Sequence, residues 1–168
     1  MELVLQVKYA LHAAKGMRHL HRIHRMHRDL KCDNLLINVN GIVKVADLGC
    51  TKIAPKIDDN PVRTAPEIFR GEAYNGAVDV YSYGNTLWEI ITAKIPYFEK
   101  FDRGMMAGEI LEQVVRCDLR PEFPVLCNDD LKKVAESCWN GNPLVRPTFE
   151  DIVQTLQGIW LTIRADEM

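Results

Sequence analysis

The sequence has no long apolar run and no paired-cysteine motif. Its apolar opening is interrupted by Glu2, Gln6, Lys8 and Lys15, which excludes a signal-peptide core or a membrane span there. The five cysteines are odd in number and widely spaced, and they form no Cys-x-x-Cys pair, so they indicate free thiols rather than a zinc site or a redox dithiol. No Asn-x-Ser/Thr sequon occurs either. We therefore expect an intracellular protein, cytoplasmic or nuclear.

The sequence also lacks a large excess of positive or negative charge. Across 168 residues, 21 Lys and Arg oppose 23 Asp and Glu, which gives a net charge of −2. No overall basic field therefore favours nucleic acid or an anionic membrane as a partner. The 47% apolar and 26% charged content, without internal repeats, excludes a disordered, collagen-like or coiled-coil chain. This length suits one globular domain with an apolar core.

Hydrophobic periodicity predicts a mostly helical chain. Apolar residues recur at steps of three and four over about residues 3–21, which is the pattern of an amphipathic helix. Residues 76–93 are apolar on most sides and predict a buried helix, whereas residues 104–116 and 129–139 have one-sided patterns. A capping box begins a final helix over about 148–164.

Two β-prone runs, residues 35–39 and 42–46, predict the strands of a short β-hairpin. The dipeptide between them, Asn40-Gly41, suits the positive φ angles of a type I′ turn. After the hairpin, residues 50–64 are polar and show no period of either kind, so they predict a loop.

The open end of this hairpin gathers charged and polar groups. With a two-residue turn, Asn34 and Asp47 stand opposite each other across the strands. Asp29 and Lys31 lie just upstream. Mg²⁺ prefers oxygen ligands and usually takes one or two carboxylates together with waters and substrate phosphates. The constellation favours phosphoryl transfer, and the alternative is that these residues only cap a loop.

Five motifs, in this order, resemble the protein kinase superfamily. They are HRDLKCDN at 27–34, DLG at 47–49, APE at 65–67, DVYSYG at 79–84 and CWNGNPLVRP at 138–147. The last two are most similar to the tyrosine-kinase-like group of serine/threonine kinases. The resemblance covers essentially the whole chain. It implies a mainly α fold with a small β-hairpin, which is the C-terminal, large lobe of a protein-kinase-like fold without the N-terminal β-rich lobe.

The resemblance implies that residues 1–168 form one partial kinase domain. Its parts are a first helix at 3–21, a catalytic loop at 27–34, a hairpin at 35–46, an activation segment at 47–67 and a helical subdomain at 76–164. The implied cofactors are ATP and Mg²⁺, and the implied partner is a protein substrate.

Residue roles also follow from the resemblance. Asp29 would accept the proton of the substrate hydroxyl, and Lys31 would neutralise charge on the transferring phosphoryl group. Asn34 and Asp47 would hold magnesium, and Leu36 would form the apolar floor beneath the adenine ring. A lysine two residues after the aspartate resembles serine/threonine kinases, so the implied acceptor is a Ser or Thr hydroxyl.

Further positions match structural residues of the family. Glu67 and Arg146 match a buried ion pair, and Asp79 matches the residue that anchors the backbone of the catalytic loop. His27 and Leu48 match two members of an internal hydrophobic spine, with leucine in the place of the usual phenylalanine.

The activation segment departs from the family's pattern. Gly49 closes the DLG motif, but Asn60 replaces the threonine that usually bonds to the catalytic aspartate. The resemblance places Arg28 to receive a phosphate or an acidic group, yet the middle of the segment has no Ser, Thr or Tyr. Asp58 and Asp59 could supply that negative charge, and the alternative is a solvated acidic turn.

The motifs of the kinase small lobe are missing. No Gly-x-Gly-x-x-Gly occurs, and the 26 residues before His27 are taken up by the first predicted helix. We therefore expect either a fragment of a longer kinase or a truncated product, with little activity by itself. The alternative to an enzyme is a non-catalytic docking or regulatory module.

Histidines and arginines alternate near the end of the first helix. A metal cluster of His19, His21, His24 and His27 is disfavoured, because the spacing is not of the zinc type. The interleaved arginines could form a nucleic-acid patch, but a solvated helix face fits better because no aromatic stacking set lies nearby.

Overall fold

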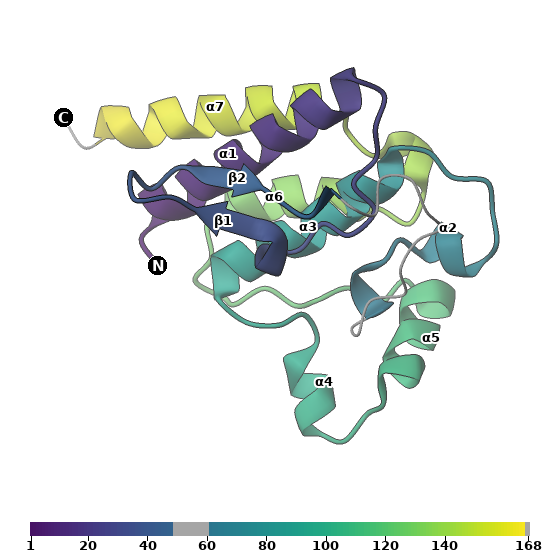
Figure 1. Ribbon diagram of the computed structural model, residues 1–168. Coiled ribbons are helices and arrows are strands. Elements are labelled where there is room, and N and C mark those ends of the chain that lie inside the picture. The colour runs from purple at the N-terminus through teal and green to yellow at the C-terminus, as the bar shows by residue number, and fades with distance from the viewer. Residues whose placement is uncertain (49–60, 167–168) are drawn as a thin grey trace.

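The computed structural model describes residues 1–48 and 61–166, which form a mostly helical protein with a small two-stranded sheet (Figure 1). The α-helices in this part are α1 (Leu3–Arg22), α2 (Pro66–Phe69), α3 (Ala77–Thr92), α4 (Phe98–Asp102), α5 (Ala107–Cys117), α6 (Asp129–Cys138) and α7 (Phe149–Asp166). Strands β1 (Leu35–Ile37) and β2 (Val43–Val45) form the sheet, and the described residues also include the short 3₁₀ helices η1 (Cys32–Asn34), η3 (Pro61–Arg63) and η4 (Pro143–Val145).

The main core lies between α1, α3, α6 and α7. Figure 1 shows α1 and α7 side by side along one edge, with the hairpin packed on α1 and with α3 and α6 behind it. Helix α3 is buried on most of its sides, as its apolar sequence predicts, and its Tyr81 and Leu87 are completely covered. Such all-round burial makes α3 the central support of the fold.

The helix ends follow local capping chemistry. The Thr148 hydroxyl accepts from the Asp151 backbone N–H at 3.2 Å, and the Asp151 carboxylate accepts from the Thr148 N–H at 2.9 Å, so the predicted capping box is present. The Asn128 side chain caps α6 by accepting from two backbone N–H groups. Helix α4 has no counterpart in the sequence prediction, because five residues are too few to show a helical period.

The hairpin forms, but its predicted register is wrong by one residue. Leu35 pairs with Val45, so the turn contains three residues, 39–41, instead of two. Gly41 has a φ of +66°, whereas Asn40 is not among the residues with positive φ, so a type I′ turn is excluded. The Asn38 side chain closes the longer turn by accepting from the backbone N–H groups of Asn40 and Ile42.

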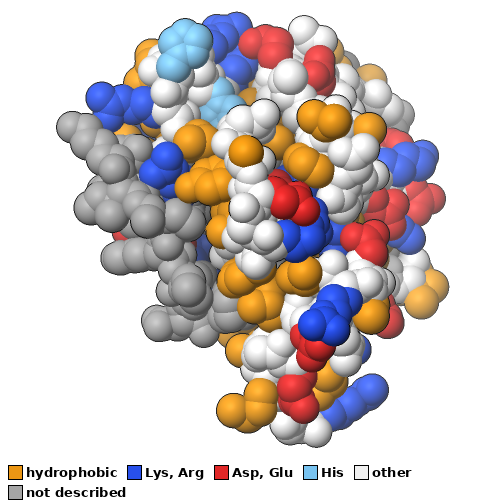
Figure 2. Space-filling model, turned by 90° about the vertical axis from the view of Figure 1, so that its right-hand side faces the viewer, with side chains coloured by type: hydrophobic (Ala, Val, Ile, Leu, Met, Phe, Trp, Pro, Cys, Tyr) orange, Lys and Arg blue, Asp and Glu red, His pale blue; other side chains and the backbone are white. Residues whose placement is uncertain are grey.

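A smaller apolar cluster supports the lower part of the molecule in Figure 1. Val62 of η3 packs with Tyr97, Ile110 and Val114, and so ties η3 to α5. Seen from the side, this region shows hydrophobic, basic and acidic side chains interspersed (Figure 2). The predicted loop over 50–64 lies mostly outside the described residues, and its last part forms η3. None of the described helices is long and apolar enough to span a membrane.

Candidate functional site

The loop that follows α1 is held by one buried carboxylate. Asp79 is fully buried on α3, and it accepts the backbone N–H groups of His27 and Arg28, each at 2.8 Å. Arg28 has a φ of +69°, a conformation that is costly for a residue other than glycine. The two hydrogen bonds therefore stabilise a backbone shape that the local sequence does not favour.

Two histidines connect this loop to its surroundings. The His21 Nε2 lies 2.8 Å from the Asp79 carboxylate, and the His21 ring packs edge-on against Phe149. His27 is completely buried; its Nδ1 accepts the Asp29 N–H at 3.3 Å, so its Nε2–H donates to the Ala46 carbonyl at 2.8 Å. His27 thus links the loop to the end of β2, whereas His21, for which no role was predicted, helps to hold Asp79.

Asp29, Lys31 and Asn34 come together as one polar cluster. The Lys31 Nζ lies 3.4 Å from one carboxylate oxygen of Asp29. The Asn34 amide nitrogen donates to the other carboxylate oxygen at 3.2 Å and to the Asp29 carbonyl at 2.6 Å. Both charged side chains are largely covered, with 12% of Asp29 and 17% of Lys31 exposed. The carboxylate is therefore fixed in direction while keeping access to solvent.

Asp47 does not oppose Asn34 across the hairpin, which corrects the sequence prediction. Because the register differs by one residue, Asn34 aligns with Ala46, whose N–H donates to the Asn34 carbonyl at 2.9 Å. Asp47 follows Ala46 with a φ of +57° and an exposed side chain. Asn34 and Asp47 are therefore offset by one residue and do not form a facing pair.

Apolar residues beside the cluster are exposed. Leu36 on β1 is 60% exposed and Leu48 is 48% exposed. Gly49, Asp58, Asp59 and Asn60 lie outside the described residues.

A second buried ion pair joins the cluster to η3. Glu89 of α3 accepts from the Arg63 side chain at 2.7 Å and from the Cys32 backbone N–H at 3.2 Å. The Glu89 side chain is only 6% exposed. The sequence alone predicts no role for Arg63 or Glu89. The one available signal was a charged residue within a helix that is apolar on most sides, since a buried charge requires a partner.

The ion pair between Glu67 and Arg146 is fully buried. The guanidinium forms two parallel hydrogen bonds to the carboxylate, at 2.6 and 2.9 Å. It also donates to the carbonyls of Ala77 and Asn140, each at 2.9 Å. This one side chain therefore connects α2, the start of α3 and the segment after α6.

Two of the arginines near the end of α1 have an acidic partner on α7. Arg18 and Arg22 both bind Glu150 of α7, at 3.1 and 2.7 Å. Within residues 1–48 and 61–166, no three His, Cys, Asp or Glu side chains are grouped so that they could hold a metal ion. This face of α1 thus serves to join α1 to α7.

Comparison with known proteins identifies similar chains. The family model described as protein tyrosine and serine/threonine kinase matches residues 1–156. The chain is 35% identical to the dual specificity protein kinase shkA of Dictyostelium discoideum and 34% identical to the serine/threonine-protein kinase STY17 of Arabidopsis thaliana. These alignments cover 95% and 96% of this chain, but only 32% and 28% of those proteins. This chain is also 37% identical to the serine/threonine/tyrosine-protein kinase HT1 of Arabidopsis thaliana. That alignment covers 90% of this chain and 39% of HT1.

Proposed function

Because the chain belongs to the protein tyrosine and serine/threonine kinase family, we propose that it is the C-terminal, catalytic lobe of a serine/threonine kinase of the tyrosine-kinase-like group. The lobe transfers the γ-phosphoryl group of ATP to a Ser or Thr hydroxyl of a protein when a small lobe, upstream or separate, supplies the remaining phosphate contacts. The observation that carries this proposal is the cluster of Asp29, Lys31 and Asn34.

In this proposal Asp29 is the proton acceptor. Lys31 and Asn34 contact different oxygens of its carboxylate and so fix the direction from which a substrate hydroxyl can approach. The Lys31 ammonium also provides positive charge beside the place where the phosphoryl group would pass. Asp79 acts through the loop backbone, because it holds His27 and Arg28 and thereby positions Asp29.

Asn34 and Asp47 suit magnesium by their chemistry. Both offer hard oxygen ligands, and the Asn34 amide turns its nitrogen toward Asp29 and therefore its oxygen away from it. Bound there, Mg²⁺ would neutralise charge on the β- and γ-phosphates of ATP. The exposed Leu36 would lie beneath the adenine ring.

The choice of Ser and Thr as acceptors depends on Lys31. Lysine at this place resembles serine/threonine kinases, and STY17 is named as one. The names of shkA and HT1 include dual specificity and tyrosine, so the assay should offer Ser, Thr and Tyr peptides in parallel.

Two carboxylate substitutions in a parent protein with both lobes test the proposed roles. Asp29→Asn should lower turnover by roughly 10²–10⁴-fold, as expected for a positioned general base. Asp47→Asn should instead raise the magnesium concentration needed for half-maximal rate, because it removes a charged ligand. Asp102→Asn on the exposed surface of α4 is the matched control. The same magnesium dependence for both variants would show that these roles are wrongly assigned.

A docking or regulatory module is the second candidate function. It is favoured by the exposure of Leu36 and Leu48, which leaves apolar surface beside the cluster for a protein partner. We expect the chain by itself to bind ATP–magnesium only weakly, because the proposed phosphate contacts come from another lobe. Calorimetry measures this affinity, and a low-micromolar dissociation constant would contradict that dependence on a small lobe.

A further inference from the structure

Three Asn-Gly dipeptides occur in the sequence, at 40–41, 75–76 and 140–141. Because glycine has no side chain, its backbone nitrogen can approach the amide carbon of the preceding asparagine closely. All three asparagines are exposed. Exposure therefore does not distinguish them, and the hydrogen bonds of each asparagine decide whether its side chain can move against that nitrogen.

Asn75 and Asn140 are held through their side chains. The Asn75 Oδ1 accepts the Ala77 N–H at 2.9 Å, and the Asn140 Oδ1 accepts the Asn142 N–H at 2.9 Å. Each side chain must leave this partner before its amide carbon can meet the glycine nitrogen. These hydrogen bonds therefore oppose a reaction between the two groups.

The backbone carbonyls of the same two asparagines are also held. The Asn75 carbonyl accepts the Val78 N–H at 3.2 Å at the start of α3, and the Asn140 carbonyl accepts from the buried Arg146 side chain at 2.9 Å. A ring between the asparagine side chain and the next backbone nitrogen closes only if the peptide between them rotates. Both peptides are therefore held against ring closure.

Asn40 differs from both. Among the described residues, its side chain and its carbonyl have no hydrogen-bond partner, and its backbone N–H donates to the Asn38 Oδ1 at 3.0 Å. The Gly41 N–H donates to the Asn38 carbonyl at 2.9 Å, and this bond must break before the nitrogen can react. Because an exposed hydrogen bond adds little net stability, the turn reaches this open state readily.

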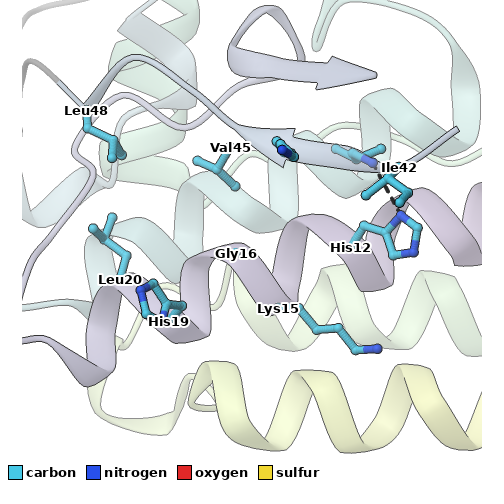
Figure 3. Close-up of a pocket in the computed structure, with 10 residues that line it drawn as sticks. His12, Lys15, Gly16, His19, Leu20, Ile42, Val45 and Leu48 are labelled. Atoms are coloured by element: carbon cyan, nitrogen blue, oxygen red, sulfur yellow. Dashed lines mark hydrogen bonds between the residues drawn. The ribbon is translucent and has the colours of Figure 1, made fainter. Parts of the chain in front are cut away.

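The anchor of the hairpin lies on its second strand and not at its tip. Figure 3 shows β2 lying along α1, where the His12 Nδ1 accepts the Val43 N–H at 3.3 Å. Residues 39–41 lie beyond this anchor, and the Val39 side chain is fully exposed. Opening of the turn therefore leaves the contact between α1 and the strand in place.

We propose that Asn40 is a site of spontaneous deamidation in the folded protein. The Gly41 nitrogen loses its proton to hydroxide and bonds to the Asn40 Cγ, and the side-chain nitrogen leaves as ammonia with a proton from water. Water then opens the cyclic imide at either of its carbonyl groups. The products are aspartate and isoaspartate at position 40, and each adds one negative charge. The reaction is independent of the proposed phosphoryl transfer.

The new carboxylate forms beside a cation. A Cβ atom on Gly41 would lie 3.0 Å from the Lys8 Nζ, so the ammonium group lies against the turn and can pair with the carboxylate. Isoaspartate also inserts a methylene group into the backbone. The Asn38 Oδ1 accepts N–H groups on both sides of the insertion, those of Asn40 and Ile42. Isoaspartate should therefore loosen the turn, whereas aspartate should keep it.

Incubation of the purified chain at mildly alkaline pH tests this proposal. Peptide mapping by mass spectrometry follows the conversion of amide to acid at the three asparagines in parallel. In the folded chain, Asn40 should convert at least about tenfold faster than Asn75 and Asn140. In urea, where the hydrogen bonds are lost, the three sites should convert at similar rates. This comparison separates the effect of the fold from that of the shared dipeptide.

Two variants connect the reaction to position 40. Asn40→Ser should remove the fast acidic product and leave the slow conversion at Asn75 unchanged, and thermal unfolding confirms that this variant is folded. Asn40→Asp has the new charge without the extra methylene group. Hydrogen exchange of the Ile42 amide should be faster in the isoaspartyl form, separated by ion-exchange chromatography, than in Asn40→Asp.

Two outcomes would overturn the proposal. One is conversion of Asn75 or Asn140 in the folded chain as fast as that of Asn40, because the hydrogen bonds then do not control the reaction. The other is retention of the Asn40 amide in the folded chain while it converts in urea, because the hydrogen bond from Gly41 to Asn38 then protects the turn.

Discussion

At the scale of single residues, burial decides which of the described cysteines can react. Burial and the neighbouring Glu89 raise the pKa of the Cys32 thiol far above its usual range, and burial raises the pKa of Cys138 to about 12. Cys117, at the end of α5, is exposed. Because the thiolate is the reactive form, we expect maleimide at pH 8 to modify Cys117 long before Cys32 and Cys138. Peptide mapping by mass spectrometry measures the order.

Two controls check that this order comes from the fold. Cys117→Ser should remove the fast labelling of the peptide that contains residue 117, and labelling in urea should make Cys32 and Cys138 react as fast as an exposed thiol. Rapid modification of Cys138 in the folded chain would contradict the packing of α6 against α3.

At the scale of elements, the contact between α1 and the hairpin depends on a glycine. A Cβ atom at Gly16 would lie 2.7 Å from the Val45 Cγ2, which is closer than atoms can approach. Gly16→Ala should therefore lower the free energy of unfolding by roughly 1–3 kcal/mol, although alanine is the better helix former. Urea denaturation provides the measurement.

Gly158 on α7 is the matched control for this substitution. A Cβ atom there would meet nothing within 4 Å, so Gly158→Ala should raise the free energy of unfolding by up to about 1 kcal/mol through helix propensity alone. If both alanine variants stabilised the chain equally, the close approach of α1 and β2 would be refuted.

At the scale of the whole molecule, Arg146 connects parts that are far apart in the sequence. It binds Glu67 and also two carbonyl groups from other segments, and its guanidinium carbon lies 5.0 Å from the centre of the Tyr81 ring. Arg146→Met leaves Glu67 buried without its cation, so the free energy of unfolding should fall by about 3–5 kcal/mol. Chemical denaturation followed by circular dichroism measures the loss.

A surface pair and a double variant show whether the loss of stability comes from leaving the Glu67 carboxylate buried without a cation. Arg116→Met breaks the exposed pair with Glu112 and should cost less than about 1 kcal/mol. Combining Glu67→Gln with Arg146→Met should recover part of the loss, because no uncompensated charge is then buried. A double variant less stable than Arg146→Met alone would show that packing, and not charge, dominates.

Local signals in the sequence determined the positions of several helices and the family to which this protein belongs. The three-to-four-residue period predicts the helix that the structure has at Leu3–Arg22, and the capping residues at 148–151 place the start of α7. The ordered motifs identified the protein kinase family, which the match over residues 1–156 confirms. These features could be predicted because each depends on neighbours within a few positions or on residues kept in a fixed order.

Other features were decided only by the tertiary structure. The hairpin register depends on whether the turn has two or three residues, and the Asn38 side chain, not the Asn40-Gly41 dipeptide, settled it. The pair of Arg63 with Glu89 joins positions 26 residues apart, and no local pattern relates them. Two hollows beside α1 are lined by residues from α1, β2 and α7, because the shape of a surface depends on which elements meet in space.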